Sequence, residues 1–470
     1  MQIWDFDKFS DSIAMKDDQG DAVTYSQLKD EGDQLADAIG RRCLVFCLCE
    51  NKPASVIGYT ACINHDIVPL MLRHDIPEGL FKHLFETYRP AFLWMPEEDA
   101  ARLGFNDVRH KLCGYVLAVA DEESKAEMNP ELALLITTSG STGSPKLVRQ
   151  SYRNIRANTD SIVDYLRIGS DEKGITTLPM NYVYGLSIVN THLAAGAMLL
   201  LTDCSIMQKA FWDFFKKEGA TSFAGVPYTY EMLDRLRFYR QDFPSLRTMT
   251  QAGGKILPKL HQKFAQYAAD NGKHFVVMYG AAEATSRMGY LPSDMALSHV
   301  GCMGIPIPGG RFELEDVDGG IISEPGKTGE LVYYGDNVTM GYALELSDLV
   351  KGDERHGRYE TGDMASFDED GIYSIVGRKK RFLKIFGNRV NLDDAERLLK
   401  TKFQGYEAAC AGKDDALYIF STDDAVLPEM KRFLAAETGL HVSAFKTRCV
   451  ESIPHNSSGK VLYSELSRYY

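Results

Sequence analysis

The chain has 470 residues, and its 52 Lys and Arg against 65 Asp and Glu give a formal net charge of −13. A composition of 44% apolar, 11% aromatic and 25% charged residues is typical of globular proteins and excludes a disordered or fibrous chain. This length suits about two to four domains. Because an acidic protein repels nucleic-acid phosphates and anionic lipids, we expect small-molecule or protein partners and no nucleic acid.

The cysteines and the N-terminus favour a cytoplasmic location. Nine cysteines are scattered along the chain, and three of them lie in CLVFCLC (43–49), which predicts a buried strand and no disulfide framework. The first residues, MQIWDFDKFSDS, contain neither the basic segment nor the apolar run of a secretory signal.

One apolar stretch, 174–202, is long enough to cross a membrane, with His192 as its only ionisable residue. Pro179, Gly185 and Gly196 interrupt it. We therefore predict a strand, a loop, a helix and a second strand here, and no integral membrane segment.

Short apolar runs alternate with amphipathic segments, as in α/β proteins. Such runs occupy 44–49, 132–137, 221–226 and 274–280. Ser151 can cap a helix that follows the second run. The sequence thus predicts an α/β fold.

From about residue 300 the chain changes to short alternating strands with Gly and Pro turns, such as GELVYYG and GIYSIVGR. A basic cluster, RKKRFLK (378–384), follows, and Asn391 or Asp393 can then cap a helix. The remainder is typical of a compact α+β unit. The predicted domains are a large one, 1–379, with a β-rich subdomain at about 300–378, and a small one, 380–470.

The segment TSGSTGSPK (138–146) directly follows the run at 132–137. Its glycines allow the backbone to approach a polyphosphate, its hydroxyls can donate hydrogen bonds, and Lys146 adds a cation. The kinase and GTPase pattern GxxxxGK[ST] does not fit it, and Pro145 prevents a helix from starting there. A Ser/Gly-rich surface loop is the alternative. The predicted phosphate-binding residues are Thr138, Ser139, Gly140, Ser141, Thr142, Gly143 and Lys146.

TSGSTGSPK resembles the signature loop of the adenylate-forming superfamily, which includes acyl- and aryl-CoA synthetases, the adenylation domains of peptide synthetases, and luciferases. The resemblance extends from TYSQLKDEGDQLADAI (24–39) to SSGK (457–460), with the motifs in family order. It implies a large N-terminal α/β domain and a small, mobile C-terminal α+β domain.

VVMYGAAEAT (276–285) is similar to the family's YGxTE element. The resemblance implies that Tyr279 and Gly280 contact the nucleotide, with the Tyr279 ring on adenine, and that Glu283 holds Mg²⁺. The sequence departs from the family at Ala282, where a Thr usually touches the α-phosphate. One such hydrogen bond is worth about 1 kcal/mol, so we expect tuning and not loss of function.

Two further motifs complete the expected nucleotide site. YETGD (359–363) resembles the ribose element, in which Asp363 would accept hydrogen bonds from both ribose hydroxyls, with Arg378 beside it; alone, TGD is a common turn. HNSSGKVLYSEL (455–466) resembles the terminal element that bears the catalytic lysine, here Lys460. Its ammonium would bridge the substrate carboxylate and the α-phosphate.

The basic cluster 378–384 would ordinarily be a solvated or nucleic-acid-binding run. In the family this segment contains the hinge between the two domains, and the resemblance implies that Lys380 is the hinge residue. Gly387 matches a glycine on the loop that lines the channel for the incoming thiol, where a side chain would obstruct.

LPMNYVYGL (178–186) resembles the wall of the family's acyl pocket. Adenylation domains for α-amino acids have an Asp in this element, at the position we align with Val183, because a buried ammonium needs a partner. No acid occurs from 174 to 202, which favours an acid without an α-amino group and with an aliphatic or aromatic tail. The predicted pocket residues are Tyr182, Val183, Tyr184, Gly185 and Gly253.

We therefore expect an AMP-forming acid–thiol ligase that uses ATP, Mg²⁺ and a carboxylic acid. CoA is the leading thiol acceptor, and the phosphopantetheine of an acyl carrier protein is the alternative. A catalytically lapsed nucleotide-binding protein is an alternative of another class, for which Ala282 is the only support.

Overall fold

The computed structural model describes residues 3–124, 126–137, 146–316, 319–386, 388–455 and 461–470. These residues form two compact units. Of the described residues, unit 1 contains those within 3–137, 146–312 and 333–359, and unit 2 contains those within 313–332 and 360–470.

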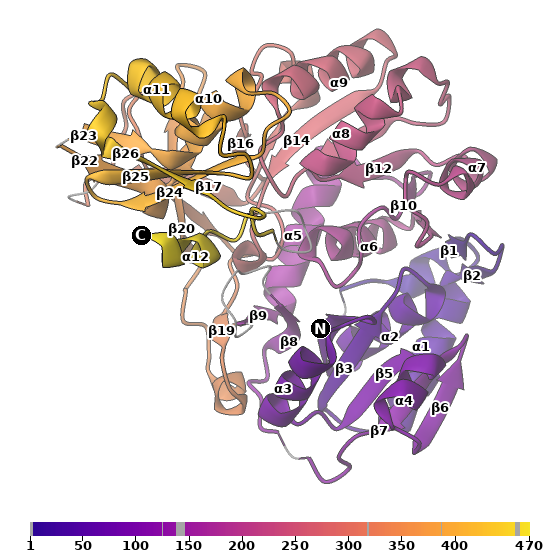
Figure 1. Cartoon of the computed structure of the whole chain (residues 1–470). Coiled ribbons are helices and arrows are strands. Elements are labelled where there is room, and N and C mark those ends of the chain that lie inside the picture. Colours follow the sequence, from indigo (N-terminus) through magenta and orange to yellow (C-terminus); the bar gives the residue numbers. More distant parts are fainter. Residues whose placement is uncertain (1–2, 125, 138–145, 317–318, 387, 456–460) are drawn as a thin grey trace. The chain divides into compact units, whose positions relative to one another are not determined.

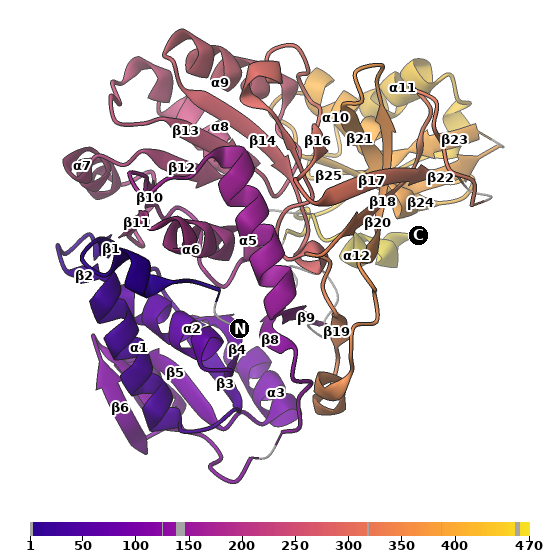
Figure 2. The same cartoon turned by 180° about the vertical axis from the view of Figure 1, so that it is seen from behind.

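Unit 1 contains a nine-stranded sheet in the order β16-β15-β14-β13-β12-β10-β11-β1-β2, visible in Figures 1 and 2. Pairing is parallel from β14 to β1 and antiparallel at both edges. Its strands are β1 (Ile13–Asp17), β2 (Ala22–Thr24), β10 (Lys173–Ile175), β11 (Met198–Leu201), β12 (Ser222–Gly225), β13 (Thr248–Gln251), β14 (His274–Tyr279), β15 (Gly289–Leu291) and β16 (Ile305–Pro306).

A second sheet in unit 1 has eight strands in the order β19-β9-β8-β4-β3-β5-β7-β6, with a parallel centre of β8, β4, β3 and β5. Its strands are β3 (Leu44–Cys49), β4 (Val68–Arg73), β5 (Phe92–Pro96), β6 (Val108–Leu112), β7 (Tyr115–Val119), β8 (Leu132–Thr137), β9 (Leu147–Ser151) and β19 (Gly341–Ala343).

Helices cover these sheets, and the main core contains residues from both sheets and from α1, α2 and α6. The helices of unit 1 are α1 (Tyr25–Ile39), α2 (Pro53–Asn64), α3 (Glu78–Tyr88), α4 (Glu97–Leu103), α5 (Tyr152–Leu166), α6 (Val183–Ala195), α7 (Lys209–Glu218), α8 (Pro227–Arg235) and α9 (Pro258–Asp270). The apolar stretch 174–202 forms β10, α6 and β11, and α6 is apolar nearly all round because it is buried. Among the described residues no helix has the length and hydropathy needed to span a membrane.

The predicted phosphate loop joins two neighbouring antiparallel strands, since Thr137 of β8 pairs with Leu147 of β9. The sequence reading did not include β9. Helix α5 begins directly after it, and Ser151 caps this helix as predicted, accepting from the Asn154 amide.

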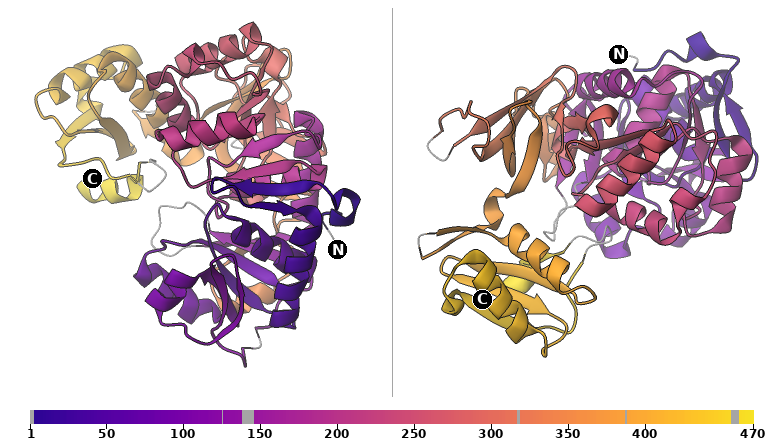
Figure 3. Two further views of the ribbon diagram at one scale, coloured as in Figure 1. Left: turned by 90° about the vertical axis from the view of Figure 1, so that its right-hand side faces the viewer. Right: turned by 90° about the horizontal axis from the view of Figure 1, so that it is seen from above.

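The four-stranded sheet β17-β18-β20-β21 lies in the segment predicted to be β-rich, at about 300–378. Farther along the chain, unit 2 has a two-stranded ribbon and a three-stranded sheet β24-β25-β26, which α10 and α11 contact (Figures 1 and 3). The elements are β17 (Gly310–Glu315), β18 (Gly329–Gly335), β20 (Arg358–Phe367), β21 (Tyr373–Arg378), β22 (Phe382–Ile385), β23 (Asn388–Asn391), α10 (Leu392–Lys402), β24 (Ala408–Lys413), β25 (Ala416–Ser421), α11 (Leu427–Thr438), β26 (Phe445–Cys449) and α12 (Tyr463–Leu466).

Short 3₁₀ helices punctuate the chain: η1 (Phe6–Phe9), η2 (Phe238–Arg240), η3 (Ala282–Ala284), η4 (Ser293–Met295), η5 (Leu346–Val350), η6 (Lys379–Arg381), η7 (Val442–Ala444) and η8 (Ser467–Tyr469). Asn391 caps α10 as expected, accepting from the Asp393 amide. The fold class predicted from the sequence, α/β with a β-rich part and a C-terminal α+β part, is confirmed. The predicted domain boundary at 379/380 is the hinge about which the small domain would move, and it stays a prediction.

Candidate active site

The predicted site residues fall into two groups. Several lie outside the described residues: Thr138, Ser139, Gly140, Ser141, Thr142, Gly143, Gly387 and Lys460. The described ones are considered below, unit by unit.

The turn after β14 carries the residues of the predicted YGxTE element. Tyr279 is the last residue of the strand and is half-buried. At Gly280 the backbone comes so close to the next turn that a Cβ would lie 1.8 Å from the Ser286 carbonyl oxygen, so a side chain does not fit here. Glu283 follows in η3. The fold itself therefore requires a glycine at this position of the motif, for steric reasons.

Tyr342 connects Glu283 and Lys146. Its hydroxyl donates to Glu283 Oε1 at 2.6 Å, and the Lys146 Nζ lies 5.2 Å from the centre of its ring. Burial, followed by the Glu283 carboxylate, raises the pKa of Tyr342 to about 12, so this phenol remains a donor at neutral pH. The structure thus brings together the carboxylate predicted to hold Mg²⁺ and the cation predicted to contact phosphate.

The chain at 337–355 fixes the backbone of this turn. The Asn337 side-chain amide donates to the carbonyls of Ala284 and Arg287 at 2.9 and 2.8 Å. Thr339 donates to the Glu283 carbonyl through both its amide (3.0 Å) and its hydroxyl (2.9 Å). Asn337 and Thr339 therefore hold the backbone of the turn, while Tyr342 separately orients the Glu283 carboxylate.

Thr285 occupies an unusual backbone conformation in the same turn. Its φ of 62° lies in the left-handed region, which is costly for a β-branched residue. Its hydroxyl donates to the Asn337 carbonyl at 2.8 Å. Such a conformation is retained when the surroundings determine it, as they do here.

In unit 2, Asp363 and Arg378 lie opposite each other on β20 and β21. Arg378 Nε lies 2.7 Å from Asp363 Oδ1, and Asp363 is 5% exposed. The predicted ribose carboxylate and its predicted neighbour are therefore adjacent, and the strand pairing alone sets their separation.

The residues that flank Lys380 are anchored to different parts of unit 2. Lys379 pairs with Glu330 of β18. Arg381 pairs with Asp393 and, at 2.7 Å, with Glu396, both on α10. The backbone of Lys380 in η6 thus lies between an attachment to the four-stranded sheet and an attachment to the C-terminal helices.

Four of the five predicted acyl-pocket residues lie at the start of α6, and Gly253 follows β13. Gly185 packs against the Pro179 carbonyl so closely that a Cβ would be 2.2 Å from its oxygen. Gly253, at φ +83°, faces the Tyr182 hydroxyl, which a Cβ would approach to 2.8 Å. The Tyr184 hydroxyl lies 2.8 Å from Thr250 Oγ1.

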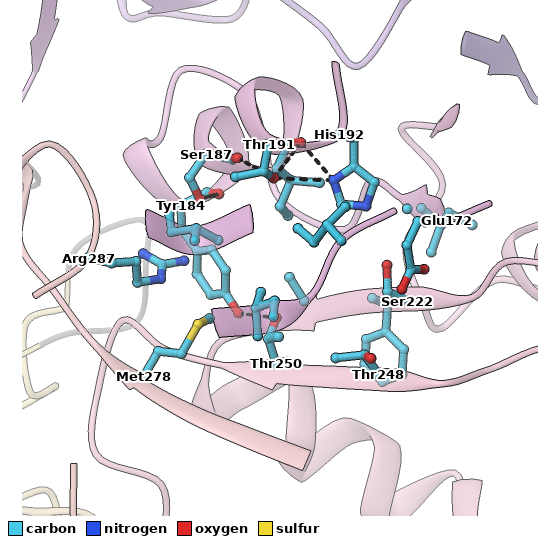
Figure 4. A pocket seen from close by; sticks show the side chains of 18 residues that line it. Glu172, Tyr184, Ser187, Thr191, His192, Ser222, Thr248, Thr250, Met278 and Arg287 are labelled. Atoms are coloured by element: carbon cyan, nitrogen blue, oxygen red, sulfur yellow. Dashed lines mark hydrogen bonds between the residues drawn. The ribbon is translucent and has the colours of Figure 1, made fainter. Parts of the chain in front are cut away.

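A small cavity adjoins this helix, between α5, α6 and the strands β10, β12, β13 and β14 (Figure 4). Its lining includes Tyr184, Ser187, Ala224, Thr250, Met278 and Arg287. Of the predicted pocket residues only Tyr184 lines it. Val183 lies beside a smaller neighbouring cavity, and Tyr182, Gly185 and Gly253 line neither of the two.

Sequence reasoning missed three residues that the fold brings to these places: Tyr342, Arg287 and His192. Tyr342 and Arg287 lie outside the motifs quoted above, and His192 was noted only as the one ionisable residue of 174–202. A signal existed only for Arg287, as a charged residue shortly after the YGxTE-like element.

Comparisons with known proteins identify the family. Residues 4–343 match the family model of AMP-binding enzymes. Among curated relatives, a feruloyl-CoA synthase of Amycolatopsis sp is 26% identical, with 96% of this chain and 94% of the relative covered. An oxalate–CoA ligase of Arabidopsis thaliana is 27% identical, with 78% and 75% covered.

Solved structures show the same fold. An o-succinylbenzoate coenzyme A synthetase of Bacillus subtilis, in complex with ATP and magnesium ion, has a TM-score of 0.79 at 20% identity, with 98% of each chain covered. MatB of Rhodopseudomonas palustris bound to ATP has a TM-score of 0.78 at 21% identity, with 100% of this chain and 99% of that chain covered. The fold and the family resemblance predicted from the sequence are thereby confirmed: this chain belongs to the AMP-binding enzyme family.

Proposed function

We propose that this chain is an AMP-forming ligase, similar to acyl-CoA synthetases, that activates a carboxylic acid with ATP and transfers the acyl group to CoA. The family match over residues 4–343 is the observation that carries the proposal. The curated relatives named above are a CoA synthase and a CoA ligase, which supports CoA as the thiol. Their acids differ, so the names alone do not select one acid for this chain.

The Lys146–Tyr342–Glu283 arrangement supports a role in nucleotide binding. Glu283 offers a half-buried carboxylate held in place by a phenol, which fits a hard cation such as Mg²⁺. When bound, that ion would neutralise phosphate charge. Lys146 would contribute a positive charge to the phosphates, and Asp363 with Arg378 would bind the ribose.

The proposed reaction has two steps that share one site. A carboxylate oxygen of the acid attacks the α-phosphorus, the bond to the β-phosphate oxygen breaks, and pyrophosphate leaves. The thiol then loses its proton and its sulfur attacks the acyl carbon, while the carbon–oxygen bond to AMP breaks. Lys460 would offset the repulsion between the carboxylate and the α-phosphate in the first step only.

Loading of a carrier-protein phosphopantetheine is the alternative acceptor reaction. The net charge of −13 disfavours it mildly, because carrier proteins are usually acidic as well. Competition between CoA and a phosphopantetheinylated carrier protein in the thioester step would separate the two.

The acid itself can be tested by ATP–pyrophosphate exchange. We expect exchange with acids that lack an α-amino group and markedly weaker exchange with any α-amino acid, D or L, because the 174–202 element contains no carboxylate to pair with an ammonium. The panel should span short, long, aromatic and dicarboxylic acids. Exchange with no acid at all would favour the lapsed, non-catalytic alternative, and a preference for an amino acid would contradict the pocket assignment.

Replacing Lys460 separates the two half-reactions. Lys460→Ala should lower adenylate formation by orders of magnitude, because the two anions then meet without its ammonium. A supplied acyl-adenylate should still give thioester, measured as CoA consumption. An equal loss in both half-reactions of the folded variant would show that one arrangement of the two domains serves both steps.

Tyr342→Phe tests the support of Glu283. Loss of the phenol hydrogen bond to this carboxylate should weaken use of Mg–ATP by about 10- to 100-fold, seen as a higher Mg²⁺ requirement in exchange assays. Tyr228→Phe is the control, because Tyr228 is 64% exposed. An unchanged Mg²⁺ dependence in Tyr342→Phe would place the metal elsewhere.

The hinge and the thiol channel are tested together. Lys380→Pro fixes φ near −65° and should hold the small domain in one pose. If that pose is the one in which the adenylate forms, ATP–pyrophosphate exchange should persist while thioester formation is lost. Gly387→Trp should give the same split by filling the channel. Full thioester synthesis by both variants would show that neither the hinge nor the channel lies at these positions.

A further inference from the structure

Arg287 is a buried guanidinium in the cavity beside α6. It is 3% exposed, and its Cζ lies 3.9 Å from the centre of the Tyr184 ring. Its Nη1 donates to the Ser286 hydroxyl at 2.7 Å and to the Ser286 carbonyl at 3.1 Å. Its Nε is buried and has no hydrogen-bond partner within the described ranges. Among the residues that the structure describes, no carboxylate pairs with it.

A second buried arginine of the same unit shows how the fold compensates such a charge elsewhere. Arg149 is 0% exposed, pairs with Glu354, and donates to the carbonyls of Tyr342 and Met340 at 3.0 and 3.2 Å. Burial of a cation without an acidic partner is costly, so the contrast at Arg287 calls for an explanation.

The other ionisable residues of the cavity do not supply the missing anion. Glu172 accepts from the Thr221 hydroxyl and lies 3.3 Å from Arg247 Nη2, so it already has a cation. Figure 4 shows it on the opposite side of the cavity from Arg287. Burial lowers the pKa of His192, and its Nδ1 bonds the Ile188 carbonyl at 2.9 Å, so this ring is neutral.

Arg287 and the residues proposed to contact the nucleotide differ in whether they line the cavity. Glu283, Lys146 and Tyr342 do not line the cavity, whereas Arg287 does. The carboxylate that reacts must lie at the α-phosphate. An anion bound by Arg287 inside the cavity is therefore a different group of the same substrate.

We propose that Arg287 binds a second anionic group of the acid, and that the substrate class is dicarboxylic. This inference rests on the proposed function of the site. A carboxylate in the cavity would receive a hydrogen bond from the Nε of a planar guanidinium that Tyr184 and Ser286 already hold in position and that Tyr165 also contacts.

The test compares dicarboxylic acids with monocarboxylic acids of equal carbon number. The aliphatic pairs run from malonate and propionate to adipate and hexanoate, and the aromatic pairs are the phthalate isomers and the matching methylbenzoates. We expect the best dicarboxylic acid to exceed its monocarboxylic match by about 10- to 100-fold in kcat/KM for exchange. In Arg287→Met this ratio should fall to about one or below, and Arg287→Lys should keep part of it.

Arg153→Met is the matched control, because it removes one positive charge from an exposed position of α5 in the same unit. It should leave the ratio unchanged. Calorimetric binding of the preferred dicarboxylate, with a non-hydrolysable ATP analogue present, gives a readout that needs no turnover. This binding should be lost in Arg287→Met alone.

Two results would overturn the inference. One is a preference of the unaltered protein for the monocarboxylic member of every pair. The other is an equal loss of exchange with both members in folded Arg287→Met, which would mean that Arg287 acts on the reacting carboxylate or on packing. Failure of the proposed function looks different: dicarboxylate binding would persist and depend on Arg287, with no exchange for any acid.

Discussion

The turn that follows strand β14 is the constraint on which the rest of the site depends. Within it Glu283 faces Tyr342, and Arg287 faces the cavity beside Tyr184. Asn337 holds the carbonyls on both sides of the turn, and Thr285 is kept at a positive φ. Because one fixed turn carries both side chains, it would set the spacing between the nucleotide's phosphates and the tail of the acid in the proposed function.

Electrostatics explain why an acidic protein can bring two anions together. The net charge of −13 is a property of the whole surface, whereas the cations are placed locally. Lys146 lies over the Tyr342 ring, and Arg355 packs on the same ring at 4.7 Å. Arg355 also donates to the Glu283 carbonyl at 3.0 Å. An anionic ligand would thus meet a cationic region that the composition does not reveal.

Much of the fold could be predicted from local patterns. The runs LVFCLC and LALLIT coincide with β3 and β8, and Ser151 and Asn391 cap helices as expected, because strand hydrophobicity and capping depend on neighbouring residues. Strand β9 was missed because its sequence, LVRQS, contains Arg149, whose charge is compensated only by distant residues.

Contacts between residues that are distant in the sequence also limit what could be predicted of the site. Motif letters indicated Glu283, Asp363 and Arg378, and the pairing of β20 with β21 brings the last two together. Tyr342 lies 59 positions from Glu283, and no spacing rule connects them. Arg287 has the opposite character: its charge is visible in the sequence, but only the tertiary structure shows that it is buried in a cavity without an acidic partner.

The central claim is that a carboxylate oxygen of the acid becomes bonded to the α-phosphorus of ATP. Its most direct test is complete turnover of an acid labelled with ¹⁸O in both carboxylate oxygens, followed by mass spectrometry of the nucleotide product. We expect AMP that carries one ¹⁸O atom and a thioester that carries the other, because attack by the thiol breaks the acyl carbon–oxygen bond. Label in inorganic phosphate with ADP as the nucleotide, or unlabelled AMP, would contradict it.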